Sequence, residues 1–233
     1  MRHLTLINLL FTVLIVVGCS SSQPADSQPS STNTTPETEQ LSKALRSVDK
    51  KYAELVEDEM TEVEVYPASF LTQYQIYRVE HFSPYKPMLF YVGYAPRGQA
   101  YLLTGMPENY INLGQADGVM LETPKEAASY ATTYLEVTRL MSDLFYQVGS
   151  MVEIEFRPNL SQEEEQVKEA FVTQYSSVIK PPQTEVTGDG YRVTVYAVRE
   201  QALERHDMLV SREGTIQDDV VILEQDLPLV YGL

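Results

Sequence analysis

Carboxylate clusters are the first feature of this chain whose residue type and spacing could do chemistry, because grouped carboxylates can bind a metal ion. Glu163–Glu165 occupy the opening turn of a predicted helix, where they complement the helix dipole. Glu57–Glu59 lack the Asp-x-Asp-x-Asp-Gly spacing of a calcium loop. Asp218 and Asp219 are adjacent in a predicted strand, so their side chains point to opposite faces and cannot chelate one ion together. We therefore expect no metal site.

Histidine and serine are the next candidates, because they serve as general bases and nucleophiles. His81 and His206 lie in the folded part of the chain, and neither belongs to a His-Glu-x-x-His pattern. Strand alternation places His206 on the same face as Glu204 and on the opposite face from Asp207, so the adjacent His-Asp pair is not a catalytic dyad. The sequence contains no Gly-x-Ser-x-Gly elbow and no glycine-rich phosphate loop. We expect no nucleotide cofactor and assign no catalytic residue.

Tyrosine is the unusual residue of the composition, with 16 tyrosines and no tryptophan. Tyrosine packs well in half-buried strands, and core filling is one interpretation of this enrichment. The other is a binding surface for a peptide or glycan, because the ring offers a flat apolar face with a polar tip. The candidates for such a surface lie in one strand-rich segment: Tyr77, Tyr85, Tyr91, Tyr94 and Tyr101. Tyr91 and Tyr94 should point to opposite faces, and at least one should be exposed or face a groove if helices cover one face only.

The N-terminal residues 1–18 have the layout of a secretory signal peptide. Arg2 is followed by an apolar run of 14 residues from Leu4 to Val17. That run is shorter than the roughly 20 residues a transmembrane helix needs. Residues 16–19, Val-Val-Gly-Cys, resemble the lipobox of bacterial lipoproteins. The resemblance implies cleavage before Cys19 and attachment of a diacylglycerol to its sulfur, as in a palmitate-bearing membrane anchor.

Charge and cysteine usage limit the partners of the exported chain. Cys19 is the only cysteine, so the chain can form neither an internal disulfide nor a thiolate metal cluster. The formal net charge is -16, and loss of Arg2 with the signal peptide leaves -17. An acidic surface of this kind repels nucleic-acid phosphates. We expect a protein on the extracytoplasmic side of a bacterial membrane, held there through Cys19, with no nucleic-acid partner.

Domain boundaries follow from a change in composition. From Ser20 to Pro36 nearly every residue is Ser, Thr, Pro, Gln or Asn, which leaves no apolar area to offset the entropy of ordering. We predict a signal peptide over residues 1–18, a lipidated cysteine with a disordered tether over 19–40, and a globular domain over 41–233. The last segment is long enough for one ordinary core or two small ones.

Hydrophobic periodicity predicts one helix and four strands in the first half of the globular part. Apolar residues three and four apart predict a helix from Leu41 to about Met60. The turn signal Pro-Arg-Gly at residues 96–98 joins the last two strands as a hairpin. The predicted strands are Glu62–Tyr66, Tyr74–Phe82, Met88–Ala95 and Gln99–Thr104.

Capping signals organise the second half. Thr123 and Glu126 form a predicted capping box with proline between them, which begins a helix that should run to about Val148. Ser161 and Glu164 form a second box that opens a shorter helix. The remaining predictions are strands: Val152–Phe156, then a meander of Tyr191–Val198, Leu203–Ser211 and Thr215–Leu223.

Together these elements predict an α+β fold, with antiparallel sheet and helices packed on one face. A helix covering a curved meander has the layout of cystatin-like and NTF2-like folds, which is an analogy of arrangement alone. We expect an envelope lipoprotein that binds a protein, a wall polymer or other glycan, or a small ligand without catalysis. The alternative is an envelope hydrolase whose active-site residues come together only in space.

Overall fold

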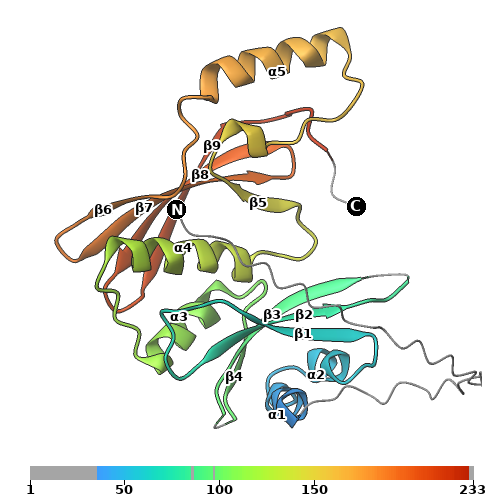
Figure 1. Ribbon diagram of the computed structural model, residues 1–233, viewed down its shortest axis with the longest axis vertical. Helices are drawn as coiled ribbons and strands as arrows, with labels where there is room; N and C mark the ends of the chain where they lie inside the picture. Colours follow the sequence, from blue (N-terminus) through green and yellow to red (C-terminus); the bar gives the residue numbers. More distant parts are fainter. Residues whose placement is uncertain (1–35, 85–86, 97, 231–233) are drawn as a thin grey trace, which may run out of the picture. The chain divides into compact units, whose positions relative to one another are not determined.

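The computed structural model describes residues 36–84, 87–96 and 98–230 (Figure 1). The predicted signal peptide, Cys19 and Tyr85 lie outside these residues. Within them the chain forms five α-helices, one short 3-10 helix and nine strands. The strands build two sheets in which all neighbours are antiparallel, one of four strands and one of five. The predicted α+β class is thereby confirmed.

The first half of the described chain consists of two short helices and sheet A. Sheet A has the strand order β1-β2-β3-β4, and its third strand turns into the fourth through Gly98, which has φ 88°. The predicted hairpin at this turn is therefore confirmed. The elements are α1 (Pro36–Leu45), α2 (Lys50–Val56), β1 (Thr61–Tyr66), β2 (Gln75–His81), β3 (Met88–Tyr94) and β4 (Ala100–Leu102).

The predicted single helix over residues 41–60 is two helices. Asp49 separates them, because its carboxylate accepts hydrogen bonds from the backbone N–H groups of Lys51 and Tyr52 and so caps the start of α2. The first helix also begins at Pro36, inside the range 19–40 predicted as tether. Leu41 and Leu45 are fully buried against sheet A, and that packing stabilises a helix whose first turn is polar.

Two further helices connect the sheets: α3 (Pro107–Asp117), which the sequence patterns did not predict, and α4 (Pro124–Thr138). The predicted capping box of α4 is confirmed, since Thr123 accepts from Glu126 N–H and the Glu126 carboxylate accepts from Thr123 N–H. The prediction that this helix reaches Val148 is wrong. Residues 145–148 form β5, whose backbone pairs with β7 of sheet B. That pairing gives the backbone N–H and C=O groups of residues 145–148 hydrogen-bond partners in a sheet, so these residues form a strand and not the end of a helix.

Sheet B contains the C-terminal meander that the sequence predicts, together with two short strands. The predicted capping box at Ser161, which begins the helix that follows it, is confirmed. The predicted tight turn at Gly214, which has φ 78°, is confirmed as well. The predicted strand 152–156 is instead the 3-10 helix η1, followed by a single bridge between Phe156 and Leu229. The elements are β5 (Phe145–Val148), η1 (Met151–Glu153), α5 (Gln162–Tyr175), β6 (Gln183–Val186), β7 (Gly190–Arg199), β8 (Ala202–Ser211) and β9 (Ile216–Glu224).

Helices lie on both sides of each sheet, which differs from the one-sided cover that we expected. The helices α1 and α2 pack on one face of sheet A, and α4 lies between the other face and sheet B (Figure 1). Tyr130 and Ala131 of α4 are fully buried in one cluster with Ile76 of sheet A and Val193 of sheet B. A helix with apolar residues on two sides can cover two sheets at once.

Candidate binding site

Sheet B presents two faces with different surroundings, because successive side chains of a strand point to opposite sides. On β7, Val193 and Val195 face α4 and join the large core cluster. Arg192 and Thr194 point the other way, to what we call the outer face of sheet B. The outer face is the side of sheet B opposite α4.

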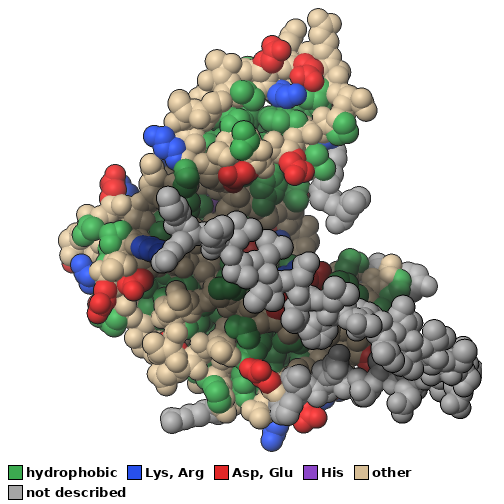
Figure 2. All heavy atoms as spheres, in the orientation of Figure 1, with side chains coloured by type: hydrophobic (Ala, Val, Ile, Leu, Met, Phe, Trp, Pro, Cys, Tyr) green, Lys and Arg blue, Asp and Glu red, His purple; other side chains and the backbone are tan. Residues whose placement is uncertain are grey.

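One end of the outer face is covered. Tyr196, Val198 and Leu203 are buried there against Phe171 of α5 and Leu227 near the C-terminus of the described chain. In Figure 2 the charged side chains of α5 lie at the top of the view, with hydrophobic side chains beneath them toward sheet B. Helix α5 therefore acts as a cover for this end of the sheet.

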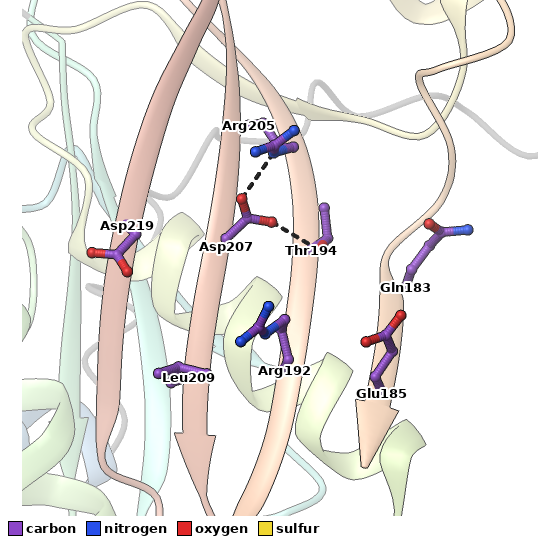
Figure 3. Close-up of a pocket in the computed structure, with 8 residues that line it drawn as sticks. All are labelled: Gln183, Glu185, Arg192, Thr194, Arg205, Asp207, Leu209 and Asp219. Atoms are coloured by element: carbon purple, nitrogen blue, oxygen red, sulfur yellow. Dashed lines mark hydrogen bonds and ion pairs between the residues drawn. The ribbon is translucent and has the colours of Figure 1, made fainter. Parts of the chain in front are cut away.

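The other end of the outer face is open and holds a shallow pocket of about 460 Å³ (Figure 3). Strands β6, β7, β8 and β9 all contribute side chains to it. An adjoining hollow of about 450 Å³ shares Arg192 and Leu209 with the pocket and continues toward the β6–β7 turn. We call the first hollow the outer-face pocket; it is lined by Gln183, Glu185, Arg192, Thr194, Arg205, Asp207, Leu209 and Asp219.

The charges of the outer-face pocket fall into a fixed set and an unpaired set. Asp207 is fixed, because Arg205 Nε donates to its Oδ2 at 2.8 Å and Thr194 Oγ1 donates to its Oδ1 at 3.0 Å (Figure 3). The side chains of Arg192, Glu185 and Asp219 make no hydrogen bond or ion pair with any residue that the structure describes. The pocket thus offers both a guanidinium and carboxylates to a ligand.

A second polar group lies on the opposite face of sheet B and is buried. His206, only 1% exposed, has its Nδ1 2.8 Å from Asp218 Oδ2 and its Nε2 3.3 Å from Glu204 Oε2. The Nε2 contact is an ion pair without good hydrogen-bond geometry. Arg199 donates from Nε to Glu204 at 3.0 Å and pairs with Asp143 at 3.3 Å. We call these five residues the His206 cluster.

The carboxylates keep the imidazole of His206 charged. Burial lowers the pKa of His206, but the hydrogen bond to Asp218 and the charges of Asp218 and Glu204 outweigh burial and raise this pKa to about 9. Burial raises the pKa of Glu204, whereas His206 and Arg199 lower it more strongly, so its pKa is below the usual range. Burial and the nearby Asp218 raise the pKa of Tyr134 on α4.

This chemistry suits a structural ion cluster and not proton abstraction. A protonated imidazole has no free lone pair, so His206 cannot accept a proton at neutral pH. Its ring is also out of contact with solvent, and Phe145 packs edge-on against it with ring centroids 6.2 Å apart. The outer-face pocket is therefore the better candidate for a site.

The tyrosines proposed as a binding surface fill cores instead. Tyr77, Tyr91 and Tyr94 are each at most 4% exposed, and Tyr101 is partly buried. Tyr85 lies outside the described residues. Tyr91 and Tyr94 point to opposite faces of sheet A, as predicted. Neither is exposed, because α1 and α2 cover one face and α4 covers the other. Tyr94 nevertheless lines a hollow of about 380 Å³ beside α1, so it faces a groove as the prediction allowed. The hydroxyl groups of these tyrosines reach the cover helices: Tyr91 donates to Glu136 of α4 at 2.7 Å.

Asp218 and Asp219 lie on the faces of sheet B that strand alternation predicts. Asp218 points to His206 and Asp219 to the outer-face pocket, so the predicted opposite orientation is confirmed. His206 lies on the face of Glu204 and not of Asp207, again as predicted. Sequence reasoning missed the contact between His206 and Asp218, which depends on the register of β8 against β9. Among the described residues, no three His, Cys, Asp or Glu side chains are placed to hold a metal ion.

Comparisons with protein-family models, with curated proteins and with solved structures each found no match to this chain. The described part of the chain contains no helix with the length and apolar character needed to cross a membrane.

Proposed function

We propose that this chain is a non-catalytic binding protein of the bacterial cell envelope, held at the extracytoplasmic side of a membrane by a lipid on Cys19. Its ligand binds in the outer-face pocket of sheet B. The observation that carries the proposal is that this pocket, with unpaired charges of both signs, occupies the one end of the outer face that α5 leaves open.

The charges of the pocket favour a ligand that carries both amino and carboxylate groups. Arg192 is suited to a carboxylate, which a guanidinium can bind through two parallel hydrogen bonds. Glu185 and Asp219 are suited to an amino group. Peptide-bearing wall polymer has both groups at short spacing and is present in the compartment that the signal peptide implies. We therefore propose the wall polymer as the ligand, in preference to a nucleotide or another polyanion.

Cosedimentation with purified wall sacculi tests this proposal. We expect the mature chain, in detergent micelles, to sediment with sacculi, and the variant Arg192→Ala to bind at least about tenfold more weakly, since a lost charged hydrogen bond is worth about 1.5–3 kcal/mol. Lys51→Ala is the matched control, because it removes one exposed cation from α2 and leaves the pocket intact.

The outcome separates site binding from general charge attraction. If Arg192→Ala and Lys51→Ala lost binding equally, only net charge would matter and the pocket would not be the site. If the unaltered chain did not sediment with sacculi at all, the wall polymer would not be the ligand.

A further inference from the structure

Strand β9 forms a free edge of sheet B. Within the described residues β9 pairs with β8 alone, whereas β7 and β8 have neighbours on both sides. A free edge presents a row of unpaired N–H and C=O groups that can pair with another chain. Proteins commonly protect such edges with charged side chains or by shortening the strand.

Among the described residues, the free edges β1 and β9 differ in that protection. The edge strand β1 of sheet A carries exposed glutamates at alternate positions, Glu62 and Glu64. The nine-residue β9 instead carries an apolar run at its centre. Val220, Val221 and Ile222 are 48%, 40% and 51% exposed. Because consecutive residues point to opposite faces, the run is apolar on both faces, a pattern typical of strands that have neighbours and cover on every side.

Acidic residues lie at both ends of this apolar run. Asp219 precedes it and is exposed, and Glu224 follows it. A second copy paired antiparallel would bring the acidic start of one strand toward the acidic end of the other, on a chain of formal charge -16. An incoming strand with basic residues at its ends would instead complement both acidic flanks.

We infer that β9 is a docking edge for an extended segment of a partner protein, with apolar residues at its centre and lysine or arginine at both ends. The segment adds a strand to sheet B. Main-chain hydrogen bonds give affinity, Val220 to Ile222 give apolar contact, and Asp219 and Glu224 select the basic ends. This edge adjoins the outer-face pocket and shares Asp219 with it, but the edge binds through backbone groups, which the pocket does not.

A labelled peptide tests the docking edge directly. The probe is a fluorescein-labelled nine-residue peptide with alternating valine and threonine between lysine pairs, and the protein is the exported chain in phosphatidylcholine nanodiscs. We expect saturable binding by fluorescence anisotropy. Replacement of the lysines by glutamate should weaken binding at least about tenfold, which corresponds to about 1.4 kcal/mol. Methylation of alternate backbone nitrogens of the peptide should abolish binding, because it removes the N–H donors.

Two variants of the chain test whether the peptide binds at β9. Val221→Lys should weaken peptide binding at least about tenfold. Val152→Lys should bind like the parent chain, since Val152 is 90% exposed in η1, which takes no part in the strand pairing of sheet B. Circular dichroism checks that both variants fold, and Val221→Thr replaces Val221→Lys if the latter does not.

Three results would overturn the inference. The first is no saturable binding of the lysine-flanked peptide. The second is equal binding of the backbone-methylated peptide, which would show contact without strand addition. The third is a dimer of the chain by analytical ultracentrifugation that Val221→Lys dissociates, which would make a second copy the occupant of this edge.

Discussion

The imidazole of His206 lies between two carboxylates in a place that water does not reach, so its charge and theirs depend on one another. Taking one charged partner away leaves a buried charge without compensation, which costs several kcal/mol. Asp218, Glu204 and Arg199 come from three different strands, and the cluster therefore joins β7, β8 and β9. Its contribution to stability should depend on the protonation of His206.

This dependence predicts a loss of stability at alkaline pH. The folded-state pKa of His206 is raised from 6.5 to about 9, so its contribution is complete below pH 6.5 and disappears as pH rises through 9. The shift corresponds to about 3 kcal/mol of unfolding free energy. Urea unfolding at pH 6 and pH 9.5 should show this difference in the parent chain, and His206→Gln should abolish it while His81→Gln keeps it.

Direct titration of His206 in the parent chain tests the same prediction without any substitution that could impair folding. The imidazole proton signals of His206, followed by NMR in the parent chain, should titrate with a midpoint near pH 9. A midpoint at or below 6.5 would show that the carboxylates do not hold the proton, and the predicted alkaline loss of stability would have no cause.

At the scale of elements, α3 shows how one residue positions a helix against a loop. Asp117, the last residue of α3, is 4% exposed. Its carboxylate accepts hydrogen bonds from the backbone N–H groups of Thr72, Gln73 and Tyr74, at 2.8, 2.6 and 2.7 Å, and from Thr72 Oγ1 at 3.1 Å. These bonds tie α3 to the segment that leads into β2.

Asp117→Asn should therefore destabilise the protein strongly for so small a change. The amide has one acceptor oxygen, and its NH₂ group would face backbone donors, so at least one buried N–H loses its partner. We expect the free energy of unfolding to fall by about 3 kcal/mol. Asp189→Asn, in the exposed β6–β7 turn, should stay within about 0.5 kcal/mol. Urea unfolding of both variants gives the comparison, and equal stability would contradict the role of Asp117.

The elements that the sequence predicted well are those with local signals. The capping boxes at Thr123 and Ser161 and the glycine turn at Gly214 act within a few residues, and the structure contains all three. Helix α4 extends too far in the prediction because residues after 138 still carry apolar residues at helical spacing. Only β7, distant in sequence, decides that residues 145–148 pair as a strand. Helix α3 has a weak apolar pattern and depends on contacts such as those of Asp117.

The site was predictable in part for the same reason. Strand alternation sufficed to separate Asp218 from Asp219 and His206 from Asp207. No local pattern says which end of a sheet face is covered, and that depends on where α5 and Leu227 pack. Of the two interpretations of the tyrosines, burial favours core filling for Tyr77, Tyr91 and Tyr94. The sequence could not decide between them, because it does not reveal that sheet A has helices on both faces.

At the scale of the whole molecule, the distance between anchor and binding surfaces depends on the segment before α1. The tether was predicted over residues 19–40, but the first helix begins at Pro36, so residues 20–35 are the part of the predicted tether that lies between Cys19 and this helix. A flexible chain of this length has a root-mean-square span of about 20–25 Å and a limit of about 55 Å when extended. Both proposed surfaces would then act close to the membrane.

The anchor itself is open to a direct test. If Cys19 carries the lipid, cells supplied with labelled palmitate should incorporate label into this protein. Cys19→Ser should remove that label completely and leave the precursor uncleaved, because the sulfur is the only thiol in the chain to which a thioether-linked lipid can attach. Ser20→Ala, one residue further on, is the matched control and should keep the label. Label that persisted in Cys19→Ser would show that the lipid is attached elsewhere, and the short reach of the tether would no longer follow.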